Sequence, residues 1–234
     1  MTWTRDDVPV VFGDDHLLVV DKPSGLVVHP APGHEGTTLA EIFAGDLAGG
    51  EEPGRAGIVH RLDRGTSGLM LLARTAEAHT RLQKMIEQRE LEREYLALVS
   101  GAPRTRTGKI DAPIGRSPRE RHRMAVDGAG ARPAVSHFEV EESLPGASLL
   151  RVRVETGRTH QIRVHMKAIG MPIFGDPTYG GPALGALERP FLHSTRVSFE
   201  HPLTGQALEL ESPLPVDLWR ALGIARSAGS AQSG

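Results

Sequence analysis

One aspartate of the chain, Asp63, lies in a polar segment that the packing of a core does not explain. The segment 60–68 reads His-Arg-Leu-Asp-Arg-Gly-Thr-Ser-Gly and lies between the apolar runs 58–59 and 69–72. Polar side chains held between buried strands are typical of sites that bind or react. The alternative is a turn aspartate that hydrogen-bonds only to its own backbone. We interpret Asp63 as a carboxylate available for chemistry.

A second polar segment supplies cations that could keep this carboxylate ionised. Residues 151–167 contain five basic residues and one acidic residue. In a helix that begins near Thr159, the spacing i, i+3, i+7 places His160, Arg163 and Lys167 on one face. An arginine on that face, directed at Asp63, would favour the ionised carboxylate that nucleophilic catalysis requires. An amphipathic helix with a merely solvated polar face is the alternative.

Eleven histidines raise the question of a metal site. Two pairs have suitable residue types, His60 with Asp63 and His160 with His165. Residues five apart on a helix point about 140° away from each other, so the second pair does not converge. Several arginines would also repel a cation, namely Arg61, Arg64, Arg158 and Arg163. Zero cysteines exclude disulfides and cysteine-ligated zinc. We expect no metal.

Charge is distributed unevenly along the chain, although the net charge is only −2. Residues 1–54 contain ten acidic and two basic residues, whereas residues 104–132 contain eight basic and three acidic ones. A basic surface on a nearly neutral protein can still bind a polyanion, because the polyanion responds to the local field. Arginine outnumbers lysine in both basic segments, which favours phosphate recognition over a solvated basic loop.

The composition is that of an ordinary globular protein, with 39% hydrophobic and 24% charged residues. A chain of 234 residues can bury roughly 70% of its unfolded surface, in one large domain or two closely packed lobes. No apolar run approaches the ~20 residues that span a bilayer, and the N-terminus lacks the regions of a signal peptide. We expect a cytoplasmic protein that does not bind a membrane.

Apolar runs and turn residues predict a sheet with few helices. Frequent hairpin signals without regular alternation of helix and strand favour a largely antiparallel α+β fold. Thr75 and Thr159 are expected to cap helices. The segment 104–132 is expected to form a long hairpin or excursion, and 175–181 a structured turn. The expected strands are 16–21, 68–73, 93–99, 134–142, 148–155, 191–199 and 206–211, and the expected helices are 37–44, 76–89 and 159–169.

These residues match a known pattern. The chain resembles the RluA-type pseudouridine synthases, which isomerise uridines in structured RNA. The segments that carry the resemblance are 60–69, 93–97, 157–163 and 170–176, together with 21–25 and 192–194. The resemblance runs from about residue 9 to 218. Gly65 departs from it, since an acidic residue is frequent there, and we expect altered turn flexibility without loss of activity.

The resemblance implies an architecture. It implies an α+β fold with a mixed, largely antiparallel central sheet, flanked by helices and loops, with a central cleft. The expected division is an N-terminal tail at 1–8, a catalytic domain at 9–221 and a disordered C-terminal tail at 222–234. The N-terminal RNA-binding domain of many relatives is expected to be lacking. We expect a monomer.

The resemblance also implies roles for individual residues. Asp63 would be the nucleophile, Tyr95 would lie against the flipped base, and Arg163 would pair with Asp63. No cofactor is implied. The partner would be structured RNA, either ribosomal or transfer RNA. An RNA-binding or folding factor of the same fold, in which modification is dispensable, is the alternative. The residues expected to bind substrate are His60, Arg61, Arg64, Thr66, Arg116, Arg119, Arg121, Arg123, Arg158, His160 and Gln161.

Overall fold

The computed structural model describes residues 2–30, 33–52, 54–120 and 123–228, and the chain forms two compact units. Unit 1 comprises Met1–Arg93 and Ser194–Ser212, and unit 2 comprises Glu94–His193 and Pro213–Gly234. Every pair of strands whose register is described runs antiparallel. The expected largely antiparallel α+β fold is confirmed.

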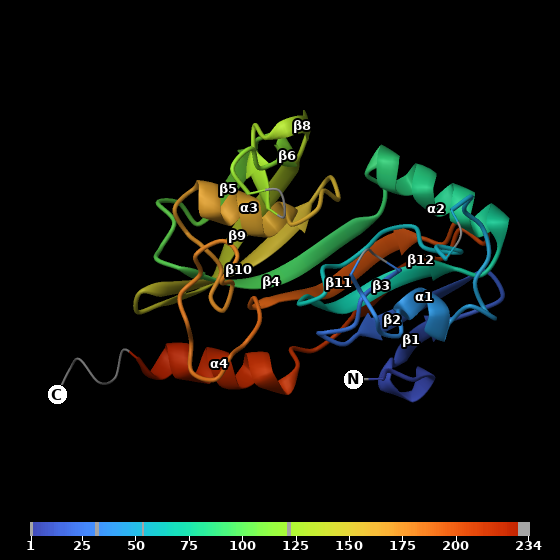
Figure 1. Ribbon diagram of the computed structural model, residues 1–234, viewed down its shortest axis with the longest axis horizontal. Coiled ribbons are helices and arrows are strands. Elements are labelled where there is room, and N and C mark those ends of the chain that lie inside the picture. The colour runs from blue at the N-terminus through green and yellow to red at the C-terminus, as the bar shows by residue number, and fades with distance from the viewer. Residues whose placement is uncertain (1, 31–32, 53, 121–122, 229–234) are drawn as a thin grey trace. The chain divides into compact units, whose positions relative to one another are not determined.

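Unit 1 is a sheet with helices beside it (Figure 1). Its strands follow the order β1-β2-β3-β11, and β12 pairs with β11. A core of leucines and valines from β2, β3 and α2 holds the sheet and helix together. The elements are η1 (Arg5–Asp7), β1 (Val10–Gly13), β2 (Leu17–Lys22), α1 (Leu39–Ile42), β3 (Ser67–Ala73), α2 (Ala76–Gln88), β11 (Leu192–Glu200, its first two residues in unit 2) and β12 (Ala207–Glu211).

Helix α2 begins and packs as its sequence predicts. The Thr75 side chain accepts a hydrogen bond from the backbone N of Ala78 at 3.1 Å, which satisfies a donor of the first turn. Leu82 and Met85 are buried on the face toward the sheet. Burying such a side chain contributes about 1.5–3 kcal/mol, so this face holds the helix in place.

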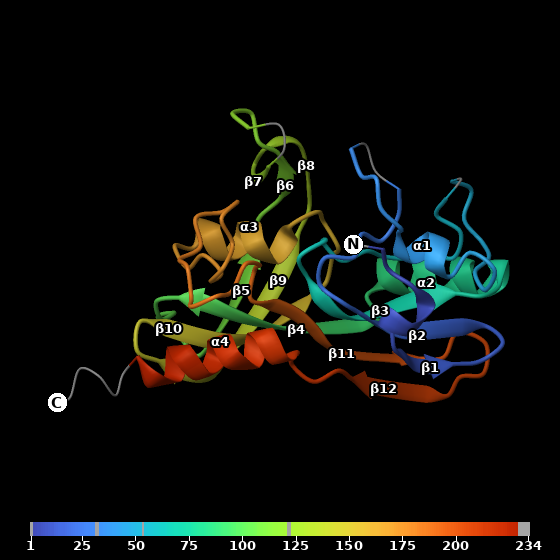
Figure 2. The same cartoon turned by 60° about the horizontal axis from the view of Figure 1, so that its bottom comes forward.

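Unit 2 contains a larger sheet in the order β4-β10-β9-β5 and a three-stranded sheet in the order β7-β6-β8. Helix α3 contacts β9 and β7, and the small sheet projects beyond α3 (Figures 1 and 2). The elements are β4 (Glu92–Ser100, its first two residues in unit 1), β5 (Thr107–Asp111), β6 (Ile114–Arg116), β7 (Met124–Val126), β8 (Ala129–Arg132), β9 (Val135–Leu144), β10 (Ala147–Val154), α3 (Gln161–Ala168) and α4 (Val216–Ser227).

Two expectations were wrong, one about the start of a helix and one about the start of the C-terminal tail. Helix α3 begins at Gln161, and its N-cap is His160 in a left-handed conformation (φ 57°), so Thr159 does not cap it. Helix α4 continues to Ser227, because Leu222 and Ala225 bury its inner face. The expected disordered tail therefore cannot begin at 222. Residues 229–234 lie outside the described part of the chain.

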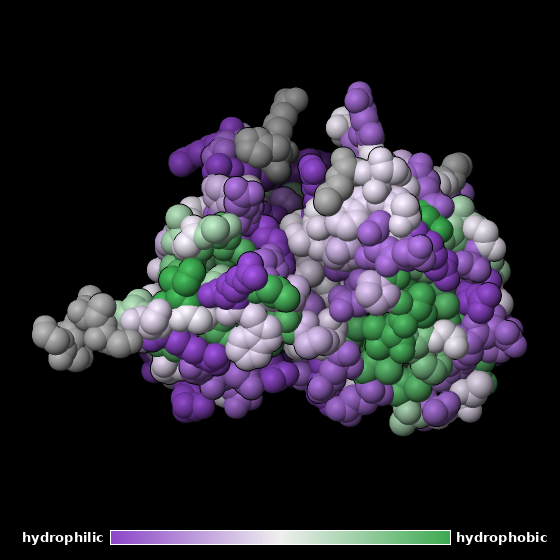
Figure 3. Space-filling view, turned by 90° about the horizontal axis from the view of Figure 1, so that it is seen from below, coloured by the Kyte–Doolittle hydropathy of each residue, from purple (hydrophilic) through white to green (hydrophobic). Residues whose placement is uncertain are grey.

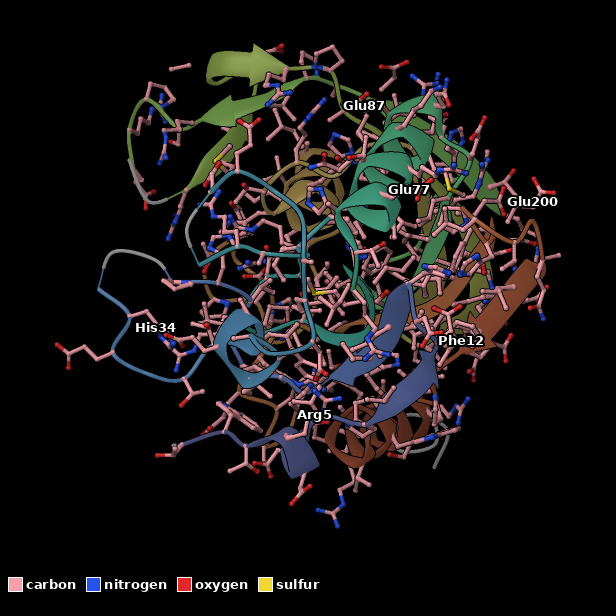
Figure 4. All side chains as sticks on the ribbon, turned by 90° about the vertical axis from the view of Figure 1, so that its right-hand side faces the viewer. Arg5, Phe12, His34, Glu77, Glu87 and Glu200 are labelled. Atoms are coloured by element: carbon pink, nitrogen blue, oxygen red, sulfur yellow. The ribbon has the colours of Figure 1, made fainter. Side chains whose placement is uncertain are left out.

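The surfaces of the two units differ in charge. In unit 1, Glu77 and Glu87 lie on α2 and Glu200 ends β11, all exposed (Figure 4). The arginine-rich segment 104–132 belongs to unit 2, where its described residues include strands β5 to β8 rather than a single hairpin. A basic surface thus belongs to the same unit as α3.

Some apolar side chains are also exposed. They include Val10 and Val11 on β1 and Trp219 on α4. One face of the surface shows separate hydrophobic areas among hydrophilic residues (Figure 3). Among the residues described, no helix combines the length and the apolar character needed to span a bilayer.

Candidate active site

Asp63 lies in a tight turn directly before β3. Its backbone O accepts a hydrogen bond from the N of Thr66 at 3.0 Å, which closes the turn. Leu62 and Thr66 on either side are buried, whereas Asp63 itself is half-buried. The flanking residues anchor the turn in unit 1 and leave the carboxylate partly accessible. This geometry suits a reactive group on a rigid support.

A neighbouring turn, Pro23–Gly25, is hydrogen-bonded to the residues that follow Asp63. The backbone N of Gly25 donates to the O of Arg64 at 2.7 Å, and Arg64 Nε donates back to the O of Gly25 at 3.2 Å. Ser24 Oγ donates to the O of Gly65 at 3.1 Å. Two hydrogen bonds therefore fix the backbone that follows Asp63, and the Arg64 side chain adds a third bond between the two turns. Arg64, expected to bind substrate, uses one donor on this turn.

Lys22 supports that neighbouring turn and was not identified from the sequence as a site residue. Its side chain is fully buried, and Nζ donates to the O of Pro23 and to the O of Leu26, each at 2.9 Å. A buried ammonium needs such acceptors, because burial without them would cost several kcal/mol. The signal in the sequence was the Asp-Lys-Pro-x-Gly segment 21–25.

His60 holds the other end of the turn. The backbone N of Leu71 in β3 donates to His60 Nε2 at 3.1 Å, which requires that nitrogen to be unprotonated. Burial, together with the charge of Arg93, lowers the pKa of His60 to about 3. His60 is therefore neutral near pH 7, and its hydrogen bond from Leu71 holds this end of the segment against β3. The expected contact of His60 with substrate stays a prediction.

Gly68 explains why this segment needs a glycine where β3 begins. A Cβ at this position would lie 2.2 Å from the backbone O of Ser194, and the φ angle is +111°. Both the close approach to Ser194 and the backbone conformation exclude a larger residue. The Thr-Ser-Gly end of the segment thus sets the spacing between β3 and β11.

Tyr95 lies on β4 in unit 2. Its side chain is buried, as are those of Ala97 and Val99, which alternate with it along the strand. It pairs in register with Val152 of β10. The expected alternation of Tyr95, Ala97 and Val99 on one face is confirmed.

Arg163 forms a bidentate ion pair with Asp176. Nε lies 2.7 Å from Oδ2 and Nη2 lies 2.8 Å from Oδ1, and the two residues are 7% and 0% exposed. Asp176 Oδ1 also accepts from the backbone N of Thr178 at 3.1 Å and of Tyr179 at 3.3 Å. The expected turn at 175–181 thus supplies Asp176 as a partner of Arg163, a pairing that the sequence did not indicate. Asp176 thus engages Nε and Nη2 of the guanidinium and fixes its plane.

The face expected from His160, Arg163 and Lys167 does not form as predicted. His160 precedes the helix, Arg163 is buried and Lys167 is exposed. The cause is that His160 lies outside the helix in a left-handed conformation, whereas Arg163 and Lys167 stay four residues apart within α3. His160 instead contacts Tyr179, with Nδ1 2.8 Å from the hydroxyl.

Gln161 holds the start of α3 to the sheet. Its side-chain oxygen accepts from Thr156 Oγ1 at 2.7 Å and from the N of Arg158 at 3.0 Å. Its side-chain nitrogen donates to the O of Val135 and to Ser136 Oγ, at 2.9 and 3.1 Å. The side chain is buried and bonded to the protein at both ends. We therefore assign it a structural role and leave it out of the proposed RNA contacts.

Four of the arginines expected to bind RNA lie in the described part of unit 2, three of them in the segment 104–132. Arg116 and Arg119 are exposed. Arg123 pairs with Glu120 at 2.8 Å, which neutralises part of its charge. Arg158 is held by a hydrogen bond from Nε to the O of Pro133, at 3.0 Å. Arg121 lies outside the described residues.

Arg158 has a like-charged neighbour. Burial and the nearby Arg132 lower the pKa of Arg158, so the two guanidiniums lie close enough to repel each other. Such a pair favours an anion between or above it, because the anion relieves the repulsion. Arg132 was counted among the basic residues but not assigned to the site.

The remaining residues of the site segments are placed as follows. Arg61 is exposed, and Thr66 is buried with no hydrogen-bond partner for Oγ1 among the described residues. His165 is buried and bonded to Ser136 Oγ and to the O of Ala112, so it is a core histidine.

Within the described ranges, no group of three or more histidine, aspartate or glutamate side chains is arranged to hold a metal ion.

Comparison with known proteins identifies the family. A family model described as RNA pseudouridylate synthase matches residues 16–168. The chain belongs to this family. The resemblance seen in the segments around Asp63, Tyr95 and Arg163 is thereby confirmed at the level of the family. As a pseudouridine synthase the protein is an RNA-modifying isomerase, which converts uridine to pseudouridine.

Individual relatives agree with this assignment. The chain is 44% identical over 239 residues to ribosomal large subunit pseudouridine synthase D of Pseudomonas aeruginosa, covering 96% of this chain and 74% of the relative. It is 43% identical over 226 residues to the RNA pseudouridine synthase YlyB of Bacillus subtilis, covering 95% and 74%. The solved structure of human RNA Pseudouridylate Synthase Domain Containing 4 has a TM-score of 0.73 at 22% identity, covering 93% of this chain and 92% of that one. That structure shows that the fold is shared.

Proposed function

We propose that this pseudouridine synthase modifies uridines of ribosomal RNA, with Asp63 as the nucleophile and without a metal or cofactor. The printed name of the Pseudomonas aeruginosa relative supports ribosomal large-subunit RNA as the substrate. Transfer RNA is the other structured RNA to test. The observation that carries the assignment of Asp63 is its half-buried position on a turn whose two ends are fixed by hydrogen bonds.

The proposed chemistry rearranges one bond. The Asp63 carboxylate attacks the target nucleotide, either at the sugar or at the base, and the bond between N1 and C1′ breaks. The uracil rotates and a bond forms between C5 and C1′. A bond between Asp63 and the sugar would break as the C5–C1′ bond forms, whereas a bond between Asp63 and the base would break afterwards. The proton on C5 then leaves with the help of Tyr95, and N1 takes up a proton. Atoms and electrons balance without an added oxidant or reductant.

Arg163 is proposed to keep Asp63 ionised. The support is that Asp176 fixes the guanidinium in one orientation within unit 2. A planar guanidinium held at one edge is preorganised to bind a second carboxylate at another edge. Preorganisation matters because a group already oriented needs no rearrangement when charge develops in the reaction.

The basic surface of unit 2 is proposed to hold the RNA. Extruding a base from structured RNA costs a few kcal/mol, which phosphate contacts offset. Arg116, Arg119, Arg132 and Arg158 are the proposed contacts among the described residues, and Arg123 is a weaker one because Glu120 pairs with it. Arg121 remains a proposed contact on its position in the sequence alone. Arg61 is proposed to support the extruded nucleotide.

The test is release of tritium from RNA labelled at C5 of uridine. Separate transcripts of ribosomal large-subunit RNA and of transfer RNA are incubated with the protein, with and without a chelator. We expect release from the ribosomal transcript that survives the chelator. The change Asp63→Ala should reduce release at least about a thousandfold, as loss of a nucleophile does. Asp15→Ala is the matched control, because Asp15 is an exposed turn aspartate of the same unit.

Four results would each contradict a different part of the proposal. Release only from transfer RNA would replace the substrate. Loss of release in chelator would establish a metal requirement. Full release by Asp63→Ala would remove Asp63 as the nucleophile. Binding of RNA without release by the unmodified protein would favour an RNA-binding factor.

A further inference from the structure

Tyr179 connects three parts of unit 2 through one side chain. It is 4% exposed, and its hydroxyl accepts a hydrogen bond from the backbone N of Met124 in β7, at 3.0 Å. The same hydroxyl lies 2.8 Å from Nδ1 of His160, the residue that caps α3. The guanidinium carbon of Arg163 lies 5.0 Å from the centre of the Tyr179 ring. A strand of the small sheet, the start of a helix and the proposed partner of the nucleophile therefore meet at this residue.

Asp176 ties the position of Tyr179 to that of Arg163. Its Oδ1 accepts from the backbone N of Tyr179 and from Arg163 Nη2, and its Oδ2 accepts from Arg163 Nε. Because all these groups are buried, each hydrogen bond would be costly to lose, which resists independent movement. A displacement of the Tyr179 backbone would shift the carboxylate that orients Arg163.

The small sheet rests on the same tyrosine. Ile114 of β6 and Val164 of α3 form an apolar cluster with Tyr179, and Met124 and Val126 of β7 pack against it. Met124, which donates to the hydroxyl, is the register partner of Arg116 in β6. Arg116 is one of the proposed RNA contacts. The pairing of β6 with β7 thus connects Arg116, a proposed phosphate contact, to the Tyr179 hydroxyl.

We propose that Tyr179 is a positioning residue that couples RNA bound on the small basic sheet to the orientation of Arg163. This inference rests on the proposed roles of Arg116 and Arg163. RNA bound to β6 shifts or stiffens β7. The hydrogen bond from Met124 N transmits this displacement to the Tyr179 hydroxyl, and Asp176 transmits it from Tyr179 to the Arg163 guanidinium. The device would favour the reactive arrangement when the correct RNA is in place.

The test is a double-mutant cycle with Tyr179→Phe and Arg116→Ala. Tyr179→Phe keeps the ring and removes the hydroxyl. We measure single-turnover tritium release and the Kd for the labelled ribosomal transcript, and far-UV circular dichroism verifies folding. Tyr179→Phe should slow release about tenfold, the factor that corresponds to one ordinary hydrogen bond, and change the Kd less than threefold. Ser148→Ala is the control, because it removes another buried hydroxyl of unit 2, which donates to the O of Gly101 at 2.9 Å, and it should leave the rate within about twofold of wild type.

Coupling predicts that Arg116→Ala slows wild type but adds no further slowing to Tyr179→Phe. Rates that multiply would overturn the inference and leave the proposed function intact. A second readout does not need activity. Backbone hydrogen exchange in residues 173–181 should slow when the transcript binds wild type, and should not slow in Tyr179→Phe. At a transcript concentration well above the measured Kd, equal slowing in both proteins, or none in either, would also overturn it, even if the bound transcript proved not to be the substrate.

Discussion

Arg163 and Asp176 share two parallel hydrogen bonds inside unit 2, of 2.7 and 2.8 Å, with almost no exposure to solvent. A buried ion pair of this kind is weak evidence for added stability, since desolvation offsets much of the attraction. Its effect is to fix orientation. In this enzyme it fixes the arginine that we propose as the partner of the nucleophile.

Removing Asp176 should therefore be costly. Asp176→Ala leaves a buried guanidinium and two backbone donors without their acceptor, and we expect a loss of about 3–5 kcal/mol in the free energy of unfolding, measured with urea. Asp217→Ala is a matched control. Asp217 also binds an arginine, Arg189, with two bonds of 2.6 and 2.9 Å, but it is 50% exposed. We expect about 1 kcal/mol or less for that variant. Equal losses would contradict the importance of burial.

The close approach at Gly68 gives a second prediction. Gly68→Ala places a Cβ 2.2 Å from the O of Ser194, so the two strands must separate. We expect a loss of more than about 3 kcal/mol, or no folded protein. Gly205→Ala is the comparison, because Gly205 also has a positive φ of 73° but nothing within 4 Å of the added Cβ. It should cost only about 1–2 kcal/mol. Similar thermal stabilities for the two variants would count against the steric account.

His60 should make the protein less stable in acid. Its folded pKa of about 3 lies below the 6.5 of an ordinary histidine, so the unfolded chain binds the proton first as pH falls. Its contribution to stability is thus complete above pH 6.5 and is lost as pH falls from 6.5 toward 3. Between pH 7 and 5, His60→Gln should lose about 2 kcal/mol less than wild type in urea unfolding. Parallel pH profiles for the two proteins would show that His60 is not the responsible group.

The proposed RNA contacts predict a change in salt dependence. Arg119→Ala removes an exposed cation of the basic surface, and it should weaken RNA binding and reduce the slope of log K against log salt by about 0.7–0.9. Arg81→Ala is the control, because Arg81 is exposed but lies on α2 of unit 1, paired with Glu77 at 2.6 Å. Its slope should match wild type. Filter binding at several salt concentrations measures both, and an unchanged slope for Arg119→Ala would remove that residue from the contact surface.

Much of the fold could be predicted from local patterns. The cap at Thr75, the strand at Ser67–Ala73 and the alternation of Tyr95, Ala97 and Val99 are each set by residues close in sequence. The start of α3 could not, because Gln161 is held there by Thr156, Val135 and Ser136, and two of these lie more than twenty residues away. Thr159 fits the local pattern of a cap, but the distant partners of Gln161 decide where the helix begins.

The family, the arginine-rich segment and the proposal that Asp63 is the nucleophile could all be reached from the sequence alone, because residue types and short spacings encode them. Only the tertiary structure decided which groups Arg163 and Tyr179 contact. Asp176 lies thirteen residues from Arg163, and Met124 lies fifty-five residues from Tyr179. Those contacts depend on how α3, the 175–181 turn and the small sheet pack together, and no local pattern specifies that packing.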